Sequence, residues 1–134
     1  RGWEKVREWG WLSRAMAAKV LDISKIGIVT FLSYPNHIDL RCNKMFEYMA
    51  AGIPVVASNF KTWRGVIEKY ACGICVDPGN PEEIAEAINL LLRDDKTART
   101  MGENGRQAVR SIFNWENEER KLVRVYHSIL NAHV

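Results

Sequence analysis

Apolar residues along the chain alternate between short β-branched runs and stretches of helical period. The β-branched runs predict buried strands over residues 26–32, 55–58 and 73–76. The first run is almost continuously apolar, so we expect it to be covered on both of its faces. Apolar residues at helical spacing predict helices over about 14–22, 43–51, 62–70 and 96–111, one that begins at Pro81, and a last one that begins at Asn114.

Residue types at the expected helix ends agree with known capping patterns. Ser13 is placed to cap the first helix, and Gly52 ends the helix over 43–51. Asn80 is a cap, Pro81 occupies the first helical position, and Glu83 lies three residues after the cap, as in a capping box. The last helix presents one apolar face, which is formed by Leu122, Val125, Tyr126, Ile129 and Leu130.

Buried strands that alternate with helices predict an α/β fold with a Rossmann-like parallel sheet and flanking helices. The length of 134 residues suits one domain, which we expect to span 1–134 and to close with helices over about 81–131. Few strands are evident, and no strand follows the closing helices. The pattern therefore indicates the second half of a doubly wound domain, truncated at its N-terminus.

Composition narrows the class of protein. Apolar residues make up 47% of the chain and charged residues 26%, as in a globular domain, and no run is long enough to span a membrane. The net charge of +3 comes from mixed signs without a basic stripe, which argues against nucleic acid as a partner. A mildly basic surface is compatible with peripheral contact to anionic lipid.

The cysteines do not indicate redox or metal chemistry. Cys72 and Cys75 form a CGIC segment, but Val76, Asp77 and Pro78 follow it as a strand and a turn. A redox CxxC opens a helix, and a zinc site needs two further ligands at a recognisable spacing. We therefore expect both cysteines to belong to a buried strand, and we expect no bound metal.

A polar segment over residues 33–43 connects the first strand to the helix over 43–51. In open parallel sheets, ligands bind where loops leave the carboxyl ends of the strands. A helix N-terminus there offers free backbone N–H groups and a partial positive charge, which suit a phosphate. Arg41 and Lys44 would add two positive charges, so the segment is a candidate phosphate site without a glycine-rich motif.

The helix over 43–51 divides into two faces. Asn43, Lys44 and Glu47 share one arc, whereas Met45, Phe46 and Met49 lie opposite and should face the core. A carboxylate one turn beyond a phosphate site is placed to accept hydrogen bonds from sugar hydroxyls. A plain surface Lys–Glu pair explains the same residues, and the spacing alone leaves both interpretations open.

The segment KMFEYMAAGIPVVAS resembles the donor-site signature of the GT-B glycosyltransferases of group 1, the family of glycogen synthases and sucrose synthases. DPGNPEEIAEAINLLL, MGENGRQAV and FNWENEERKLVRVY follow that family's C-terminal domain in the same order, so the resemblance covers about residues 10–130. It implies a nucleotide-sugar-binding domain of a retaining hexosyltransferase that uses a nucleoside diphosphate sugar as its donor and needs no metal or other cofactor.

The resemblance also assigns roles to residues. Asp39 and Glu47 match the family's catalytic acidic pair: Glu47 would hold the ribose hydroxyls and Asp39 the donor sugar, although relatives usually carry Glu at the first position. Arg41, Cys42 and Asn43 would supply backbone amides to the diphosphate, and Lys44 would add a positive charge. His37 lies in the same loop, where it either touches the sugar or is solvated.

The family has a second, N-terminal domain that binds the acceptor, so we expect this partner domain to lie upstream, together with an Arg and a Lys that grip the diphosphate. Alone, this chain should hold half a donor site and show little activity. Bacterial relatives imply a glycan or lipid-linked acceptor, polysaccharide biosynthesis, and work in the cytoplasm at the inner face of the membrane. Two alternatives stay open: a non-catalytic glycosyltransferase-like scaffold and a flavodoxin-like binding module.

Overall fold

The sheet is parallel, as the sequence predicts. In the computed structural model, which describes residues 2–131, three strands run in the order β1 (Gly27–Val29), β2 (Val55–Ser58) and β3 (Gly73–Val76). Gly27 pairs with Val55, and Val55 pairs in turn with Gly73. With helices on both faces of this sheet, the expected Rossmann-like α/β architecture is confirmed.

The helices begin and end close to the positions predicted. They are the 3₁₀ turn η1 (Trp3–Lys5), α1 (Arg14–Ile23), α2 (Pro35–Ile38), α3 (Asn43–Ala51), α4 (Lys61–Tyr70), α5 (Pro81–Arg93), α6 (Asp95–Ser111) and α7 (Trp115–Asn131). The single turn α2 was not predicted, although Pro35 occupies its first position, as is common in helices. A four-residue helix carries too little periodic pattern to be recognised from sequence.

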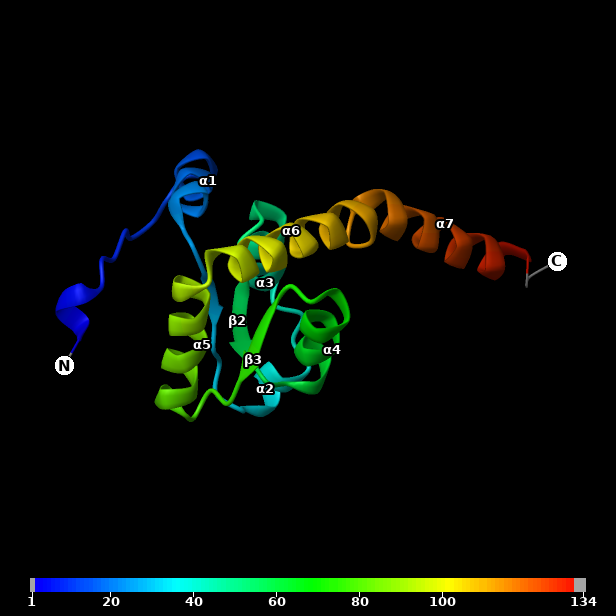
Figure 1. Cartoon of the computed structure of the whole chain (residues 1–134). Helices are drawn as coiled ribbons and strands as arrows, with labels where there is room; N and C mark the ends of the chain where they lie inside the picture. The colour runs from blue at the N-terminus through cyan, green and yellow to red at the C-terminus, as the bar shows by residue number, and fades with distance from the viewer. Residues whose placement is uncertain (1, 132–134) are drawn as a thin grey trace.

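Side chains of β2 alternate between two apolar clusters. Val55 and Ala57 face α3 and α4, where they lie in one cluster with Met49 and Trp63, each at most 1% exposed. Val56 points to the other face and packs with Leu91 of α5. Figure 1 shows the resulting layers, with α5 on one side of the strands and α4 on the other. The expected core face of α3 is confirmed, since Met45 and Met49 are buried and Phe46 packs against them.

Strand β1 is shorter and more exposed than predicted. It ends at Val29 rather than at residue 32, and Ile28 is 45% exposed. The strand lies at the edge of the sheet, with β2 as its neighbour within residues 2–131. The ladder with β2 ends at Val29, and two residues later the carbonyl of Phe31 accepts a hydrogen bond from the Ser58 hydroxyl (2.8 Å).

The helix caps follow the sequence, with one difference. The Ser13 and Asn80 side chains accept hydrogen bonds from the N–H groups of Met16 and Glu83. The carboxylate of Glu83 does not return to its own cap residue, because it accepts from the backbone N–H of Asp77 instead (3.1 Å). The capping box predicted here is therefore replaced by a link between α5 and the end of β3.

Helix α6 crosses the amino edge of the sheet. Gly105 lies against Met49 and Cys72, the residue before β3, and Arg106 donates a hydrogen bond to the carbonyl of Ala51 at the end of α3 (2.8 Å). Gly52 then leaves α3 in the left-handed conformation at φ 75°. Because α6 occupies this edge, the loops at the carboxyl ends of the strands lie on the opposite side of the molecule, where α2 is seen in Figure 1.

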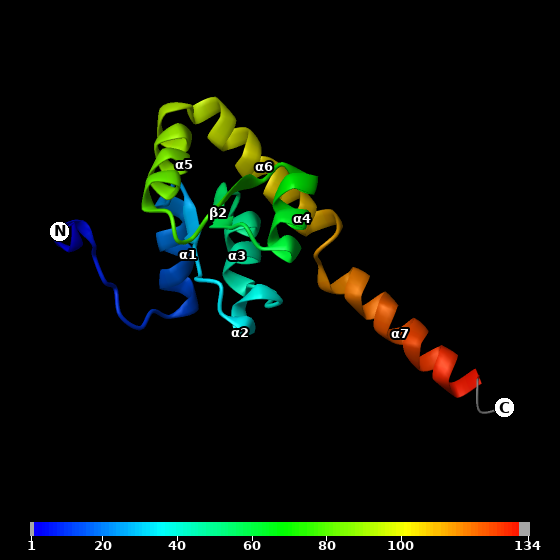
Figure 2. The same ribbon diagram turned by 90° about the horizontal axis from the view of Figure 1, so that it is seen from below.

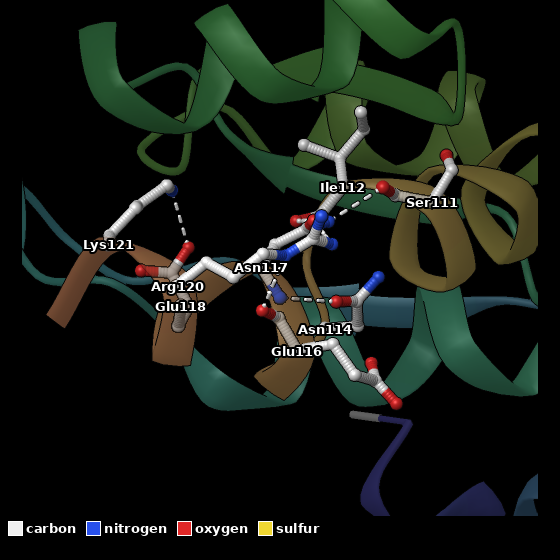
Figure 3. Close-up of polar contacts among 8 residues, drawn as sticks. All are labelled: Ser111, Ile112, Asn114, Glu116, Asn117, Glu118, Arg120 and Lys121. Carbon is white, nitrogen blue, oxygen red and sulfur yellow. Dashed lines mark hydrogen bonds and ion pairs between the residues drawn. The ribbon is translucent and has the colours of Figure 1, made fainter. Parts of the chain in front are cut away.

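Helix α7 projects away from the rest of the chain (Figures 1 and 2). Its start is fixed by Asn114, which accepts from the N–H of Asn117, while the Asn117 amide donates to the carbonyls of Ser111 and Ile112 (Figure 3). The predicted apolar face exists, and its five residues are exposed: Leu122, Val125, Tyr126, Ile129 and Leu130.

Candidate functional site

The candidate site is the connection between β1 and α3, at the carboxyl edge of the sheet. It runs from Thr30 to Cys42 and includes the single turn α2. The N-termini of α3 and α4 lie at the same edge, because both helices follow the carboxyl ends of parallel strands. The structure therefore places the predicted polar segment where an open α/β sheet binds its ligands.

The first part of this connection is held by two side chains that donate to carbonyls. The Ser58 hydroxyl, fully buried at the end of β2, donates to the carbonyl of Phe31, and His37 Nδ1 is 3.0 Å from the carbonyl oxygen of Leu32. The His37 ring is also packed against Phe31 and Tyr34, with centroid separations of 5.0 and 5.7 Å. His37 thus braces the loop, which the sequence did not predict, and its contact with the donor sugar stays a prediction.

The second part is held from α4. The Thr62 hydroxyl donates to the carbonyl of Ile38 (3.1 Å), and the Trp63 indole N–H donates to the carbonyl of Leu40 (2.5 Å). These two carbonyls lie on either side of Asp39. Sequence reasoning missed this pair, because Thr62 and Trp63 are more than twenty residues from the loop and appear in the sequence as an ordinary helix start.

Asp39 and Arg41 are both exposed, and both line a pocket of about 230 Å³ between the loop, α3 and α4. Its remaining walls are mostly apolar and include Phe46 and Trp63. Lys44 and Glu47 do not line this pocket. The structure therefore brings Asp39 and Arg41 together beside α4 and sets the polar face of α3 apart from them.

Cys42 caps α3 with its backbone only. Its side chain is 4% exposed and belongs to the core, and it makes no capping hydrogen bond. After it, Asn43, Lys44 and Glu47 are exposed along one face of α3, as the helical spacing predicts. The first turn of α3 thus presents uncapped backbone N–H groups next to a lysine, with a carboxylate one turn further on.

In the part of the chain that the structure describes, none of the charged side chains of this site has an ion-pair partner. Within residues 2–131, the ion pairs join Arg99 to Asp95, Arg106 to Glu103 and Lys121 to Glu118. Asp39, Arg41, Lys44 and Glu47 take part in none of them, so the interpretation of Lys44 and Glu47 as a surface salt bridge does not hold. Two cationic and two anionic side chains are thereby available to a ligand.

The prediction for the cysteine segment is confirmed in part. Cys75 lies in β3 and is partly buried, whereas Cys72 is buried and lies immediately before that strand; burial raises the pKa of each thiol to about 11. Within residues 2–131, no three His, Cys, Asp or Glu side chains come close enough together to hold a metal ion.

Similar proteins are found by sequence and by structure. The family model described as glycosyl transferases group 1 matches residues 10–108. Spore coat protein SA of Bacillus subtilis (strain 168) is 35% identical over 82 residues, which are 60% of this chain and 22% of that protein. Phosphatidyl-myo-inositol mannosyltransferase of Mycobacterium leprae (strain TN) is 34% identical over 88 residues, 66% of this chain and 23% of that protein.

Among solved structures, sucrose-phosphate synthase from Thermosynechococcus elongatus has a TM-score of 0.83 and 27% sequence identity. The match covers 96% of this chain and 31% of that one. This chain therefore spans less than a third of that structure and less than a quarter of the two curated relatives. The family match includes the whole loop and α3, so the candidate site lies inside the shared region.

Proposed function

Because the chain belongs to the group 1 glycosyl transferases, we propose that its loop and α3 form part of the donor site of a retaining glycosyltransferase. The donor would be a nucleoside diphosphate sugar, and the acceptor a hydroxyl group. The observation that carries this proposal is a set of four exposed charged side chains with no ion-pair partner among the described residues 2–131. Asp39 and Arg41 lie in the loop, and Lys44 and Glu47 lie on α3.

Each part of the site has a proposed task. The backbone N–H groups of Arg41, Cys42 and Asn43 at the uncapped start of α3 would bind the diphosphate, with Lys44 adding positive charge. Glu47, one turn further along the exposed face, would accept hydrogen bonds from the ribose hydroxyls. Asp39 would contact the donor sugar from the other side of the loop.

In the proposed reaction the bond between the anomeric carbon and the diphosphate oxygen breaks. A bond from the acceptor oxygen to the same carbon forms, and the proton of the acceptor hydroxyl passes to the oxygen of the departing diphosphate. Negative charge develops on the departing diphosphate, so amides and cations held in place beforehand would lower the barrier by electrostatic stabilisation. We propose that no metal ion takes part.

The rest of the enzyme is also part of the proposal. A second domain would supply the acceptor site and further cations for the diphosphate. One relative is a phosphatidyl-myo-inositol mannosyltransferase, and another is a capsular polysaccharide biosynthesis glycosyltransferase, which supports a hexose donor and a lipid-linked or glycan acceptor. We propose cytoplasmic work at the membrane surface. None of the helices within residues 2–131 has the length and apolar character that crossing a bilayer requires.

Calorimetric titration with UDP, GDP, UDP-glucose and GDP-mannose tests the proposal. We expect one nucleotide to bind weakly, and Glu47→Ala to reduce its affinity by about tenfold or more, because a hydrogen bond to a charged group contributes about 1.5–3 kcal/mol. Glu86→Ala is the matched control, since Glu86 is an exposed glutamate on α5, away from this edge. Equal binding by both variants, or no binding of any nucleotide, would contradict the donor role and favour a non-catalytic scaffold.

A further inference from the structure

Two hydrogen bonds grip the backbone on either side of Asp39, and both donors are adjacent residues in the first turn of α4. Thr62 holds the carbonyl of Ile38 and Trp63 holds the carbonyl of Leu40. The same two residues share the 230 Å³ pocket with Asp39 and Arg41. The start of α4 is therefore in contact with the loop at the point where the candidate acid is carried.

The other hydrogen bonds recorded for this part of the loop are local, from the N–H of Ile38 to the carbonyl of Tyr34 (3.3 Å) and from the N–H of Leu40 to the carbonyl of His37 (3.2 Å). The side chains of Ile38 and Leu40 are 40% and 44% exposed, so their burial gives the loop only a weak anchor. Helix α2 is one turn long, and isolated helices of that length are unstable in water. Asp39 ends α2 at the C-cap position, where its N–H donates to the carbonyl of His37.

The donors themselves are rigid. The Trp63 ring is 1% exposed and is packed edge-on against Phe31 and Phe60, with centroid separations of 5.8 and 5.0 Å. Thr62 is β-branched, which restricts its side-chain rotamer on a helix. A buried indole and a restricted hydroxyl therefore hold the two carbonyls in fixed places.

We propose that Thr62 and Trp63 are positioning residues, which set the backbone of residues 38–42 before the ligand binds. The inference rests on the donor role proposed for the loop. The chain runs from the gripped carbonyl of Leu40 directly into Arg41 and Cys42, so the same two bonds aim both the Asp39 carboxylate and the amides at the start of α3. Sites that are preorganised in this way depend strongly on the groups behind them.

Thr62→Val is the sharpest test, because it removes the hydroxyl but keeps the shape, and Thr62 is exposed. We expect the affinity for UDP-glucose or GDP-mannose, whichever the chain binds, to fall about five- to tenfold. The affinity for the corresponding nucleoside should stay within twofold, since Glu47 on α3 would still hold the ribose. Thr62→Ser should restore binding, because it restores the donor hydroxyl.

Thr100→Val is the matched control: Thr100 donates to the carbonyl of Lys96 within α6, at the other edge of the sheet. This control should change neither the affinity for the nucleotide sugar nor the affinity for the nucleoside.

Trp63→Phe is the second variant, because it removes the N–H donor but keeps an aromatic ring in the core. The thermal unfolding of Trp63→Phe is measured as well, to check that the variant remains folded. In the folded variant we expect the same selective loss of nucleotide-sugar binding.

Hydrogen exchange of the backbone amides of residues 38–40, followed by NMR in the free protein, separates this inference from the proposed function, because these amides donate to the carbonyls of Tyr34 and His37 and so have protection to lose. Thr62→Val should speed exchange in this segment by about fivefold or more, while Thr62→Ser and Thr100→Val should not. If exchange and affinity are both unchanged in Thr62→Val, or if nucleoside binding falls as much as nucleotide-sugar binding, the positioning role is wrong. If the chain binds no nucleotide but the exchange changes as expected, the proposed function fails and the anchoring of the loop stands.

Discussion

Gly102 of α6 lies directly against the carbonyl oxygen of Gly52, so that a Cβ atom at position 102 would overlap the backbone at the end of α3. The absence of a side chain here lets α6 cross α3 in close contact. Three residues later, Gly105 continues the same close approach to Met49 and Cys72. The crossing fixes α3 at the end opposite to the candidate site.

Gly102→Ala should therefore destabilise the fold. Alanine is favoured over glycine in a helix by about 1 kcal/mol, but overpacking against backbone costs about 1–3 kcal/mol and outweighs that gain when the backbone cannot move. We expect a net loss of about 1–2 kcal/mol in the free energy of unfolding, measured by urea denaturation. An unchanged or higher stability would show that α6 can shift away from α3 at little cost.

Gly65→Ala is the matched substitution with the opposite expected sign. Gly65 lies inside α4, where a Cβ atom would meet nothing within 4 Å. Only the helix propensity changes, so the free energy of unfolding should rise by about 0.5–1 kcal/mol. A loss of stability here would mean that this face of α4 is covered in the folded protein.

The thiols of Cys72 and Cys75 should react slowly with iodoacetamide at neutral pH. Burial raises the pKa of both to about 11, and the thiolate is the reactive form. We expect rates at least a hundredfold below those in urea-unfolded protein, followed by mass spectrometry. Because folding favours the protonated thiols, they contribute to the stability of the folded protein. This contribution is complete at pH values below the pKa of the thiols in the unfolded chain, and it is lost as the pH rises through about 11. Fast labelling in the native state would contradict the burial of these thiols.

Asp94 should titrate below its usual range. Its carboxylate accepts hydrogen bonds from the Thr97 hydroxyl (2.6 Å) and the Thr97 N–H (3.0 Å), and these bonds lower its pKa. Because folding lowers this pKa, the ionised carboxylate stabilises the folded protein at pH values above the pKa that Asp94 has in the unfolded chain. This contribution is lost as the pH falls through the pKa of Asp94 in the folded protein. Thr97→Val should raise the pKa of Asp94 in an NMR titration, whereas Thr100→Val should leave it unchanged. No change in Thr97→Val would show that the backbone bond alone sets the pKa.

Asp39→Glu should strengthen contact with the donor sugar if the proposed function is correct. The longer side chain extends about 1.5 Å further from the same backbone. We expect the ratio of affinities for UDP-glucose over UDP, or for GDP-mannose over GDP, to rise severalfold, and Asp39→Asn to lower it. If the ratio of affinities is the same in the wild-type protein and in both variants, Asp39 does not contact the donor sugar.

The sequence predicts most helices and strands because their boundaries are local. Asn80, Gly52 and Asn114 mark helix ends with side chains or conformations that act within a few residues. The polar face of α3 follows from helical spacing, and the structure exposes it as predicted. These features depend on neighbouring residues, so a single sequence is enough to locate them.

The features that the sequence does not reveal have a different cause. Ser58, Thr62 and Trp63 donate the hydrogen bonds to the loop after β1, and all three lie far from it in the sequence. The sequence places His37 in this loop but does not show that its ring meets the Leu32 carbonyl and two aromatic rings. Such tertiary hydrogen bonds follow no periodic pattern, and only the folded arrangement shows them.

The grip of α4 on the two carbonyls beside Asp39 has an evolutionary consequence. Both bonds are accepted by main-chain carbonyls, so neither depends on which side chain stands at position 39. We expect mutation to lengthen, shorten or neutralise that side chain while the neighbouring amides stay in place. Under the proposed function, position 39 would then be a site where new donor preferences can be sampled in one step, without a compensating change in the scaffold.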